Sequence, residues 1–316
     1  MGIFRSWIWS GWNGCLRKLR RRIPESAHQL DNQHPSQRKF LLDPFEADRQ
    51  VIHTKVKESQ TMAPSQNISL EGKVAFISGA SKGIGVAISE AFSNAGADLA
   101  LTARNAEELE QTAESARKSG SKVWTQTAEM ADTQEVKSLA EDTLKHFGRV
   151  DILVNNAGVT IPQPILEAEI ENFHTIINVN VLAPLLLTQA FAPGMIEQGH
   201  GKIINISSRA AIRAFPTGGI YSASKSALQL LTQTMAVEFG PHNVQANCIA
   251  PTVTMTPMGE SAWPPSPRRD VKLSRIPTGR FAEAEEVASA ALFLASSQSD
   301  FISGVELPID GGEGAG

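Results

Sequence analysis

From about residue 68 onward, short apolar runs alternate with longer segments of helical pattern, and this alternation constrains the fold more than any other feature. The apolar runs are nearly continuous, as in strands buried on both faces. Repeated strand–helix units predict a parallel sheet covered by helices on both faces, with right-handed crossovers. We therefore predict an α/β fold with one doubly wound domain over residues 66–316. Strands are expected at 73–79, 98–104, 122–128, 151–158, 202–208 and 244–251, and helices at 84–95, 107–118, 135–147, 170–195 and 221–239.

The composition limits the class of protein. Of 316 residues, 41% are hydrophobic and 20% are charged, an ordinary mix for a folded soluble domain. This excludes a fully disordered chain, a collagen-like fibre and a polytopic membrane protein, and we expect no run of the roughly 18 apolar residues that a spanning helix needs. The two cysteines, Cys15 and Cys248, cannot build a disulfide framework or a zinc cluster, so we predict no metal site and a reducing compartment.

The charge is divided unevenly along the chain. Residues 66–316 hold 18 Lys and Arg against 27 Asp and Glu, and a part this acidic is a poor candidate for binding nucleic acid. Residues 1–65 hold 11 against 6, so this part of the chain is basic. We predict that residues 1–65 form a basic, largely disordered extension, in which residues 26–65 are a polar linker.

Residues 1–24 carry six basic residues, no acidic residue and an apolar stripe on a helical wheel. Three interpretations stay open. The segment fits a mitochondrial presequence, a helix that lies on an anionic membrane surface, with a weak myristoylation pattern beside it, or a tail without function. We favour a cytoplasmic protein, with a mitochondrial location as the alternative.

The first strand runs directly into a glycine-rich turn, SGASKGIG, that opens the first helix. Gly79, Gly83 and Gly85 allow a tight turn and let the backbone approach a pyrophosphate. The N–H groups and the dipole of the helix N-terminus then hold the negative charge. An ordinary strand–helix turn is the alternative, but the position of the turn in the first strand–helix unit favours a dinucleotide site.

Two cations stand where the second ribose of a dinucleotide would lie. Arg104 ends the second strand, where NAD-specific folds place an acidic residue, and Lys82 lies inside the glycine turn. Both can neutralise a 2′-phosphate, whereas an acidic residue would accept the 2′-hydroxyl. We therefore predict NADP(H) as the cofactor; solvated surface cations are the alternative.

The only tyrosine of the chain, Tyr221, is followed four residues later by Lys225 at the start of a predicted helix. This spacing places both side chains on one helical face. A nearby ammonium lowers the pKa of a phenol, so that the tyrosine can exchange a proton with an alcohol or carbonyl oxygen. Ser208, at the end of a predicted strand, can hydrogen-bond the same oxygen.

These motifs, together with NNAG at 155–158, INVN ending at Asn180, NISS and YSASK, resemble those of the short-chain dehydrogenase/reductase family over residues 68–312. The resemblance implies a seven-stranded Rossmann sheet and a homotetramer. It implies four catalytic residues: Tyr221 as general acid/base, Ser208 polarising the substrate oxygen, Lys225 binding the nicotinamide ribose and lowering the tyrosine pKa, and Asn180 holding a relay water. The cofactor contacts that we expect are Gly79, Lys82, Gly83, Ile84, Gly85, Arg104, Glu129, Met130, Asn155, Ala157, Gly158, Tyr221, Lys225, Pro251, Thr254 and Thr256.

The chain departs from the family pattern at Ser78-Gly79, at Glu129-Met130 and at Pro251-Thr252. The segment 251–263 resembles the substrate loop of the family's L-xylulose (dicarbonyl) reductases and related sugar-alcohol dehydrogenases. We therefore expect an NADP(H)-dependent oxidoreductase that interconverts a carbonyl and a secondary alcohol of a ketose, polyol or α-dicarbonyl. The alternatives are a reductase of a bulkier ketone, such as a polyketide, steroid or 3-oxoacyl intermediate, and a cofactor sensor without turnover. A hydrolase is disfavoured because no G-x-S-x-G motif occurs.

Overall fold

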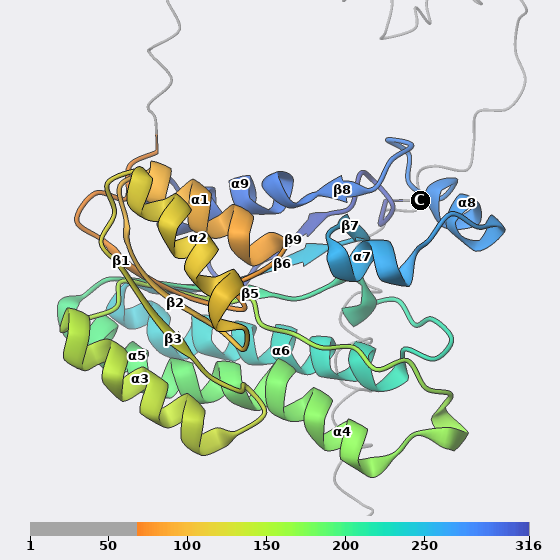
Figure 1. Ribbon diagram of the computed structural model, residues 1–316, viewed down its shortest axis with the longest axis horizontal. Helices are drawn as coiled ribbons and strands as arrows, with labels where there is room; N and C mark the ends of the chain where they lie inside the picture. Colours follow the sequence, from red (N-terminus) through yellow and green to blue (C-terminus); the bar gives the residue numbers. More distant parts are fainter. Residues whose placement is uncertain (1–67, 316) are drawn as a thin grey trace, which may run out of the picture. The chain divides into compact units, whose positions relative to one another are not determined.

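Seven parallel strands form one sheet in the order β3-β2-β1-β4-β5-β6-β9 (Figure 1). The computed structural model describes residues 68–315. Because the strand order reverses between β1 and β4, the carboxyl ends of these strands form the crevice where doubly wound sheets bind ligands. The predicted α/β fold and its parallel sheet are therefore confirmed. The strands are β1 (Val74–Ser78), β2 (Asp98–Ala103), β3 (Val123–Thr127), β4 (Ile152–Asn155), β5 (Gly201–Ile206), β6 (Val244–Pro251) and β9 (Glu306–Ile309).

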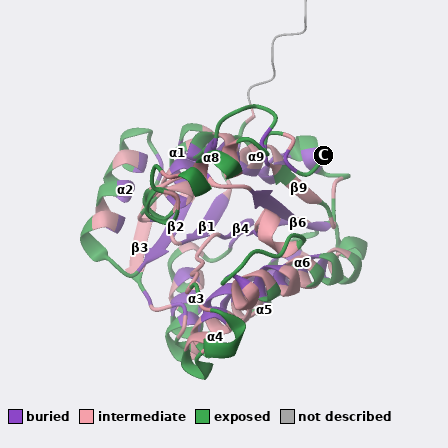
Figure 2. Ribbon diagram, turned by 90° about the vertical axis from the view of Figure 1, so that its right-hand side faces the viewer, coloured by how far each residue is buried: buried purple, intermediate pink, exposed green. Residues whose placement is uncertain are grey.

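Helices cover both faces of the sheet, and the buried residues lie between the layers (Figures 1 and 2). One face carries α1 (Ile84–Asn94), α2 (Ala106–Lys118) and α9 (Ala284–Ala295). The other face carries α3 (Thr133–Phe147), α4 (Ile170–Ile177), α5 (Ala183–Gln198) and α6 (Gly219–Phe239).

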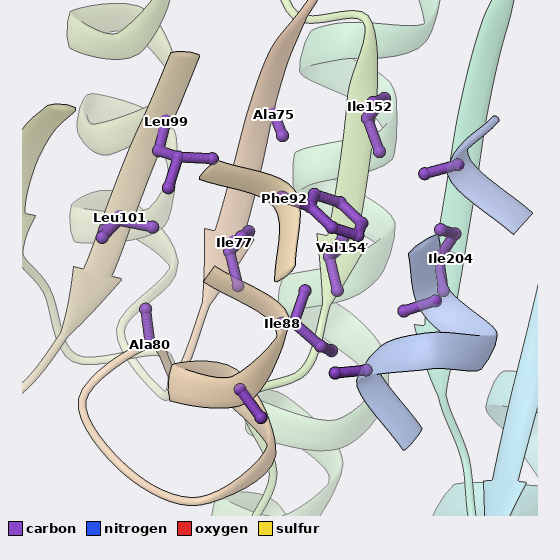
Figure 3. Close-up of a cluster of buried hydrophobic side chains, with 14 of the residues drawn as sticks. Ala75, Ile77, Ala80, Ile88, Phe92, Leu99, Leu101, Ile152, Val154 and Ile204 are labelled. Atoms are coloured by element: carbon purple, nitrogen blue, oxygen red, sulfur yellow. The ribbon is translucent and has the colours of Figure 1, made fainter. Parts of the chain in front are cut away.

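Each face of the sheet has its own apolar core. Under α1, Ile88 and Phe92 point toward Ile77 and Val154 of the sheet, and all four are fully buried (Figure 3). On the opposite face, the rings of Phe76 and Phe191 lie 5.1 Å apart. Burying side chains of this size stabilises the fold by roughly 1.5–3 kcal/mol each, so the two cores hold the carboxyl ends of the strands rigidly in place.

Short polar side chains cap the N-termini of α2 and α3. Asn105 Oδ1 accepts a hydrogen bond from the backbone N–H of Glu108 and caps α2. Asp132 Oδ1 accepts from the N–H of Gln134 and of Glu135 and caps α3, which starts two residues before the predicted start. These caps satisfy N–H groups that would otherwise have no partner, which fixes where each helix leaves the sheet.

The predicted helix at 170–195 is a continuous helical segment, Ile170–Gln198, with a π-helical turn, η3 (Asn178–Leu182), between α4 and α5. By length and composition the segment is apolar enough to cross a membrane, which corrects our expectation for the sequence. Half of its most apolar part is buried, and residues such as Leu187, Phe191 and Met195 pack in the core, as expected of a core helix of a soluble protein.

The chain between β6 and α9 forms elements that the pattern did not predict. Two short helices, α7 (Pro257–Ala262) and α8 (Pro267–Leu273), lie between strands β7 (Thr254–Met255) and β8 (Ala282–Glu283), which pair with each other. Prolines at the helix starts and the short lengths leave little periodicity to detect. We refer to α7 and α8 as the lid. The predicted extension, residues 1–65, lies outside the described residues.

Candidate active site

The turn after β1 brings the three predicted glycines together at the carboxyl end of the sheet. Gly79 and Gly83 have positive φ angles of 66° and 54°. A Cβ on Gly85 would lie 2.1 Å from the Gly79 carbonyl oxygen, so a side chain there would force the backbone to move. No side chain caps α1 in the described part of the chain, and its first N–H groups are therefore available to an anion. This bare backbone at a helix N-terminus fits the pyrophosphate of a dinucleotide.

The NNAG segment after β4 holds this turn in place. Asn156 Nδ2 donates to the carbonyl oxygens of Ser78 and Gly79, at 3.0 and 2.9 Å. Ser78 Oγ in turn accepts from the N–H groups of Asn156 and Ala157, both at 3.1 Å. The ends of β1 and β4 are thus bonded to each other at the crevice, and the predicted Ala157 lies at their junction.

The two predicted cations lie at the carboxyl ends of β1 and β2, but each pairs with an acidic residue. Lys82 Nζ lies 2.7 Å from Glu108 Oε1. Arg104 Nη1 lies 3.6 Å from Glu129 Oε2, and its side chain is 70% exposed. Exposed ion pairs of this kind contribute little to stability, so both cations can exchange their carboxylate for a phosphate.

Tyr221 and Lys225 lie near the start of α6, with Ser208 at the end of β5 across from them. Lys225 is buried and Nζ donates to the Ile206 carbonyl oxygen at 2.8 Å. The same Nζ lies 5.9 Å from the centre of the Tyr221 ring. The Ser208 side chain lies close enough to the Tyr221 phenol to lower its pKa, and Ser208 Oγ accepts from the Ala210 N–H at 3.1 Å. The structure therefore brings the three residues together.

Burial shifts the pKa values of Lys225 and Tyr221. It lowers the pKa of Lys225 to about 8, because a buried ammonium loses its hydration. It also raises the pKa of Tyr221, and the hydrogen bond from Ser208 opposes this rise. The expected lowering of the tyrosine pKa by Lys225 is thus not observed, because Nζ is directed to the Ile206 carbonyl oxygen and the phenol is desolvated.

Asn180 is fully buried in the π-helical turn, where its side chain bonds the backbone of Val159 in both directions. Asn180 Oδ1 accepts from the Val159 N–H at 2.9 Å and Nδ2 donates to the Val159 carbonyl oxygen at 3.0 Å. Nδ2 also donates to Ser224 Oγ at 2.9 Å. A Cβ on Gly158 would lie 3.3 Å from Lys225 Nζ and 3.5 Å from Asn180 Oδ1. Asn180, Gly158 and Lys225 therefore meet at one point.

Other predicted cofactor contacts have side chains that are used inside the protein. Asn155 is buried, and its Nδ2 donates to Asn205 Oδ1 at 2.7 Å. Met130 packs in the core beside α3. Glu129 Oε1 accepts from the Ala131 N–H at 3.1 Å, in addition to its pairing with Arg104. Ile84, the first residue of α1, packs against the core under that helix. Asn155 Oδ1 is buried without a hydrogen-bond partner in the described residues, whereas the Met130 side chain is taken up by the core.

The segment after β6 reaches back to the glycine turn. Pro251 and Thr254 are buried. Thr256 Oγ1 accepts from the Gly259 N–H at 3.1 Å and caps α7. A Cβ on Gly83 would lie 2.7 Å from the Thr256 methyl group. Thr256 therefore connects the lid to the predicted pyrophosphate site.

Several residues that support the site were not predicted. Asn156 and Ser224 belong to quoted motifs, so the motifs themselves were the available signal. Arg209, Glu306 and Glu313 stand in no such pattern, and their contacts come from distant parts of the chain.

A surface hollow of about 520 Å³ lies away from this site. Its lining includes Gly72, Asp98 and Arg149 at the amino ends of the strands, the opposite edge from Ser208. Within residues 68–315, no cluster of three or more His, Cys, Asp or Glu side chains is arranged to hold a metal ion.

Comparisons with known proteins match most of the described chain. A family model described as enoyl-(acyl carrier protein) reductase matches residues 79–313. L-xylulose reductase from Mus musculus is 39% identical over 247 residues, which are 78% of this chain and 98% of that protein. D-threitol dehydrogenase from Mycolicibacterium smegmatis is 38% identical over 257 residues, 81% and 98% of the two chains. The crystal structure of a gluconate 5-dehydrogenase from Burkholderia cenocepacia in complex with NADP and tartrate has a TM-score of 0.74 at 33% identity, and the match covers 78% of this chain and 97% of that one.

Proposed function

The chain belongs to the short-chain dehydrogenase/reductase family and is an oxidoreductase that acts on CH–OH groups, and on this basis we propose that it is an NADPH-dependent reductase of ketoses or α-dicarbonyls. The observation that carries the proposal is the arrangement of Ser208, Tyr221 and Lys225 beside a glycine turn that fits a pyrophosphate.

NADPH supplies the hydride when it is bound. Ser208 donates a hydrogen bond to the substrate carbonyl oxygen, and Tyr221 gives its phenolic proton to that oxygen as negative charge develops. Lys225 contributes its positive charge and binds the nicotinamide ribose. Asn180 holds the backbone around Val159 and a relay water that returns a proton to Tyr221. Burial raises the pKa of Tyr221 further above its ordinary value, so the phenol is protonated at neutral pH and can give this proton to the substrate oxygen.

The cofactor proposal rests on the cations. Lys82 and Arg104 are the cations at the two predicted contact points for a 2′-phosphate, and no acidic residue ends β2. NADP in the complex of the Burkholderia enzyme supports the same choice. Backbone groups of the predicted glycine and NNAG segments, together with Thr256, complete this cofactor site.

The substrate proposal rests on the relatives and on their names. L-xylulose reductase, D-threitol dehydrogenase and D-erythrulose reductase from Gallus gallus all carry the name of a small polyhydroxylated substrate. A reductase of bulkier ketones is the second candidate, and the observation that favours it is the set of exposed apolar side chains Ile165, Phe215 and Met258 in the segments flanking the active site.

We also propose that the protein forms a homotetramer. The helical segment Ile170–Gln198 is apolar along its length although only half of its most apolar part is buried within one chain. Leu230 and Val237 on α6 are also exposed. Apolar surface of this kind is typical of faces that a second copy covers.

The test is a substrate screen with the full-length protein. Loss of NADPH absorbance is followed with L-xylulose, diacetyl and a bulky cyclic ketone, in parallel with NADH. The proposal predicts turnover with L-xylulose or diacetyl and a preference for NADPH. Turnover with the bulky ketone alone would favour the second candidate, and no turnover with any carbonyl compound would overturn both.

A further inference from the structure

A row of polar side chains crosses four neighbouring strands just below the catalytic residues. In the register of the sheet, Asn155 pairs with Asn205, Asn205 with Cys248, and Cys248 with Glu306. On β5 the member of this row is Asn205, which directly precedes Ile206. The carbonyl oxygen of Ile206 accepts the hydrogen bond from Lys225 Nζ. Polar side chains inside a sheet are costly unless they are hydrogen-bonded, so their partners indicate what the row does.

The partners of the row lie on α6, the helix that carries Tyr221 and Lys225. Asn205 Nδ2 donates to Thr232 Oγ1 at 2.7 Å, and Thr232 Oγ1 lies 3.1 Å from Cys248 Sγ. Gln229 Nε2 donates to Glu306 Oε2. Gln229 and Thr232 follow Lys225 by four and seven positions, so they lie on the same helical face. The row therefore sets the position of α6 along the sheet.

Glu306 also binds the segment that carries Ser208. Arg209, the next residue after Ser208, places Nη1 3.1 Å from Glu306 Oε1. Its Nε lies 2.9 Å from Asp310 Oδ2, as an ion pair that is not aligned for a hydrogen bond. The side chains of Arg209, Glu306 and Asp310 are only 11%, 12% and 8% exposed. A Cβ on Gly314 would lie 2.0 Å from Arg209 Nη2, so the C-terminal segment packs directly on the guanidinium.

One carboxylate thus joins two catalytic elements. Glu306 accepts from Arg209 beside Ser208 with one oxygen and from Gln229 on α6 with the other. A buried ion pair of this kind is weak evidence for a role in stability, because apolar residues of similar size would often serve as well. The ion pair does fix the orientation of Arg209 relative to Glu306, because a planar guanidinium binds a carboxylate in a defined direction.

We propose that Arg209 and Glu306 are positioning residues that hold Ser208 in place beside the Tyr221 side chain. This inference rests on the proposed function for its effect on turnover, and it makes strand β9 and the C-terminal segment part of the catalytic framework.

The only tyrosine in the chain is Tyr221, so the alkaline tyrosinate absorbance of the full-length protein reports this one residue. The titration is run on the wild type, Ser208→Ala, Arg209→Met, Arg209→Lys and Glu306→Gln, with circular dichroism at each pH to show that the fold is intact. Arg149→Met is the matched control, because Arg149 Nε also pairs with a buried carboxylate, that of Asp151, at 3.1 Å, but at the opposite edge of the sheet.

Since the hydrogen bond from Ser208 lowers the pKa of Tyr221, a displaced Ser208 raises that pKa. We expect Arg209→Met and Glu306→Gln to shift the titration upward in the same direction as Ser208→Ala, and to reduce kcat at least about tenfold with a smaller change in KM. Arg209→Lys keeps the positive charge but lacks the planar guanidinium with its several N–H donors, so we expect an intermediate shift of the Tyr221 pKa. Arg149→Met loses stability but leaves the titration and kcat unchanged.

Two results would overturn the inference. The first is a wild-type titration and kcat in both Glu306→Gln and Arg209→Lys; these conservative variants decide the question even where Arg209→Met does not fold. The second is an equal shift in Arg149→Met, which would show a general effect of lost stability. The tyrosine titration needs no substrate. It therefore still tests whether Arg209 positions Ser208, even if the wild type reduces none of the carbonyl compounds in the screen.

Discussion

Burial determines the proton chemistry of the two central side chains, Tyr221 and Lys225. It raises the pKa of the phenol and lowers that of the ammonium to about 8. Both shifts favour the neutral form of the side chain. The site therefore holds a proton on Tyr221 at neutral pH, as a carbonyl reductase needs, and keeps the charge on Lys225 only up to mildly alkaline pH.

The first prediction concerns the pH dependence that Lys225 produces. Carbonyl reduction should decline as pH rises through about 8, because Lys225 then loses its charge. Between about pH 8 and 10.5 the unfolded chain binds more protons at this residue than the native one, so the free energy of unfolding gains a contribution that rises with pH. Lys225→Met should abolish turnover, remove this contribution and stabilise the protein at pH 7 by roughly 1–3 kcal/mol. Urea unfolding of the wild type and of Lys225→Met at pH 7 and 9.5 measures the free energies of unfolding. A Lys225→Met protein that is less stable than the wild type at pH 7 would contradict the prediction.

The second prediction concerns cofactor choice at Arg104. Replacing Arg104 with Asp should shift the ratio of NADPH to NADH efficiency toward NADH by about 10- to 100-fold, because the carboxylate accepts a 2′-hydroxyl and repels a 2′-phosphate. Arg117→Asp, an exposed arginine at the end of α2, is the control. Steady-state kinetics with both cofactors decide it: an unchanged ratio in Arg104→Asp would mean that the Arg104 side chain stays in solvent beside Glu129.

Residues in short motifs could be predicted from the sequence, whereas residues joined by the fold could not. Gly79, Gly83 and Gly85 lie within one turn, and Tyr221 and Lys225 within one helical turn, so spacing alone places them together. Arg209 and Glu306 are 97 positions apart and meet only because β9 completes the sheet. The direction of the Tyr221 pKa shift also depends on burial, which no local pattern records.

At the scale of elements, the lid is connected to the C-terminal segment through Glu313. This carboxylate is 4% exposed; its Oε1 lies 2.5 Å from Lys272 Nζ on α8, and its Oε2 accepts from Thr252 Oγ1 at 2.5 Å. Burial opposes the charge, but the hydrogen bonds from Lys272 and Thr252 hold the pKa of Glu313 below its ordinary value. The lid is therefore held against the end of β6, beside the predicted cofactor contacts.

The third prediction tests this contact. Glu313→Gln should loosen the lid and raise the KM for the carbonyl substrate about fivefold, the effect of roughly 1 kcal/mol, with little change in kcat. In the wild type the contact is present at neutral pH and is lost as pH falls through the lowered pKa of Glu313. Kinetics at pH 7 are compared with Glu260→Gln, an exposed acid on α7. An equal KM in the two variants would show that Glu313 does not hold the lid.

The elements themselves were predictable to different degrees. The helices at α2 and α3 have clear spacing, and their caps, Asn105 and Asp132, shift the starts by one or two residues. The π-helical turn around Asn180 leaves the apolar pattern of its segment unchanged, so the segment is predicted as one plain helix. In the lid, six- and seven-residue helices with prolines at their starts are too short for any periodicity to appear.

At the scale of the whole molecule, the fourth prediction concerns residues 1–61. The described fold begins near Leu70, which is buried and whose N–H donates to the Ala95 carbonyl oxygen at 2.7 Å. A protein that starts at Met62 keeps this contact, so it should fold, form the proposed homotetramer and retain its kcat. Sedimentation and steady-state kinetics of the truncated protein check this. An insoluble or inactive product would mean that the extension packs on the domain.

The extension itself is tested by location in the cell. A fluorescent fusion of residues 1–65 should mark mitochondria if the basic apolar stripe is a presequence, or a membrane surface if it is an anchor. Diffuse fluorescence would support a tail without function.

The turnover of Tyr221→Phe tests whether Tyr221 is the proton donor. This change removes the phenolic oxygen and leaves the ring, so the packing near Lys225 stays as it is. If Tyr221 supplies the proton in carbonyl reduction, kcat should fall by about 10²–10⁴-fold, while NADPH binding, measured by fluorescence titration, stays as in the wild type. Retention of more than about a tenth of wild-type turnover, with NADPH bound normally, would contradict the assignment of Tyr221 as the acid and with it the proposed mechanism.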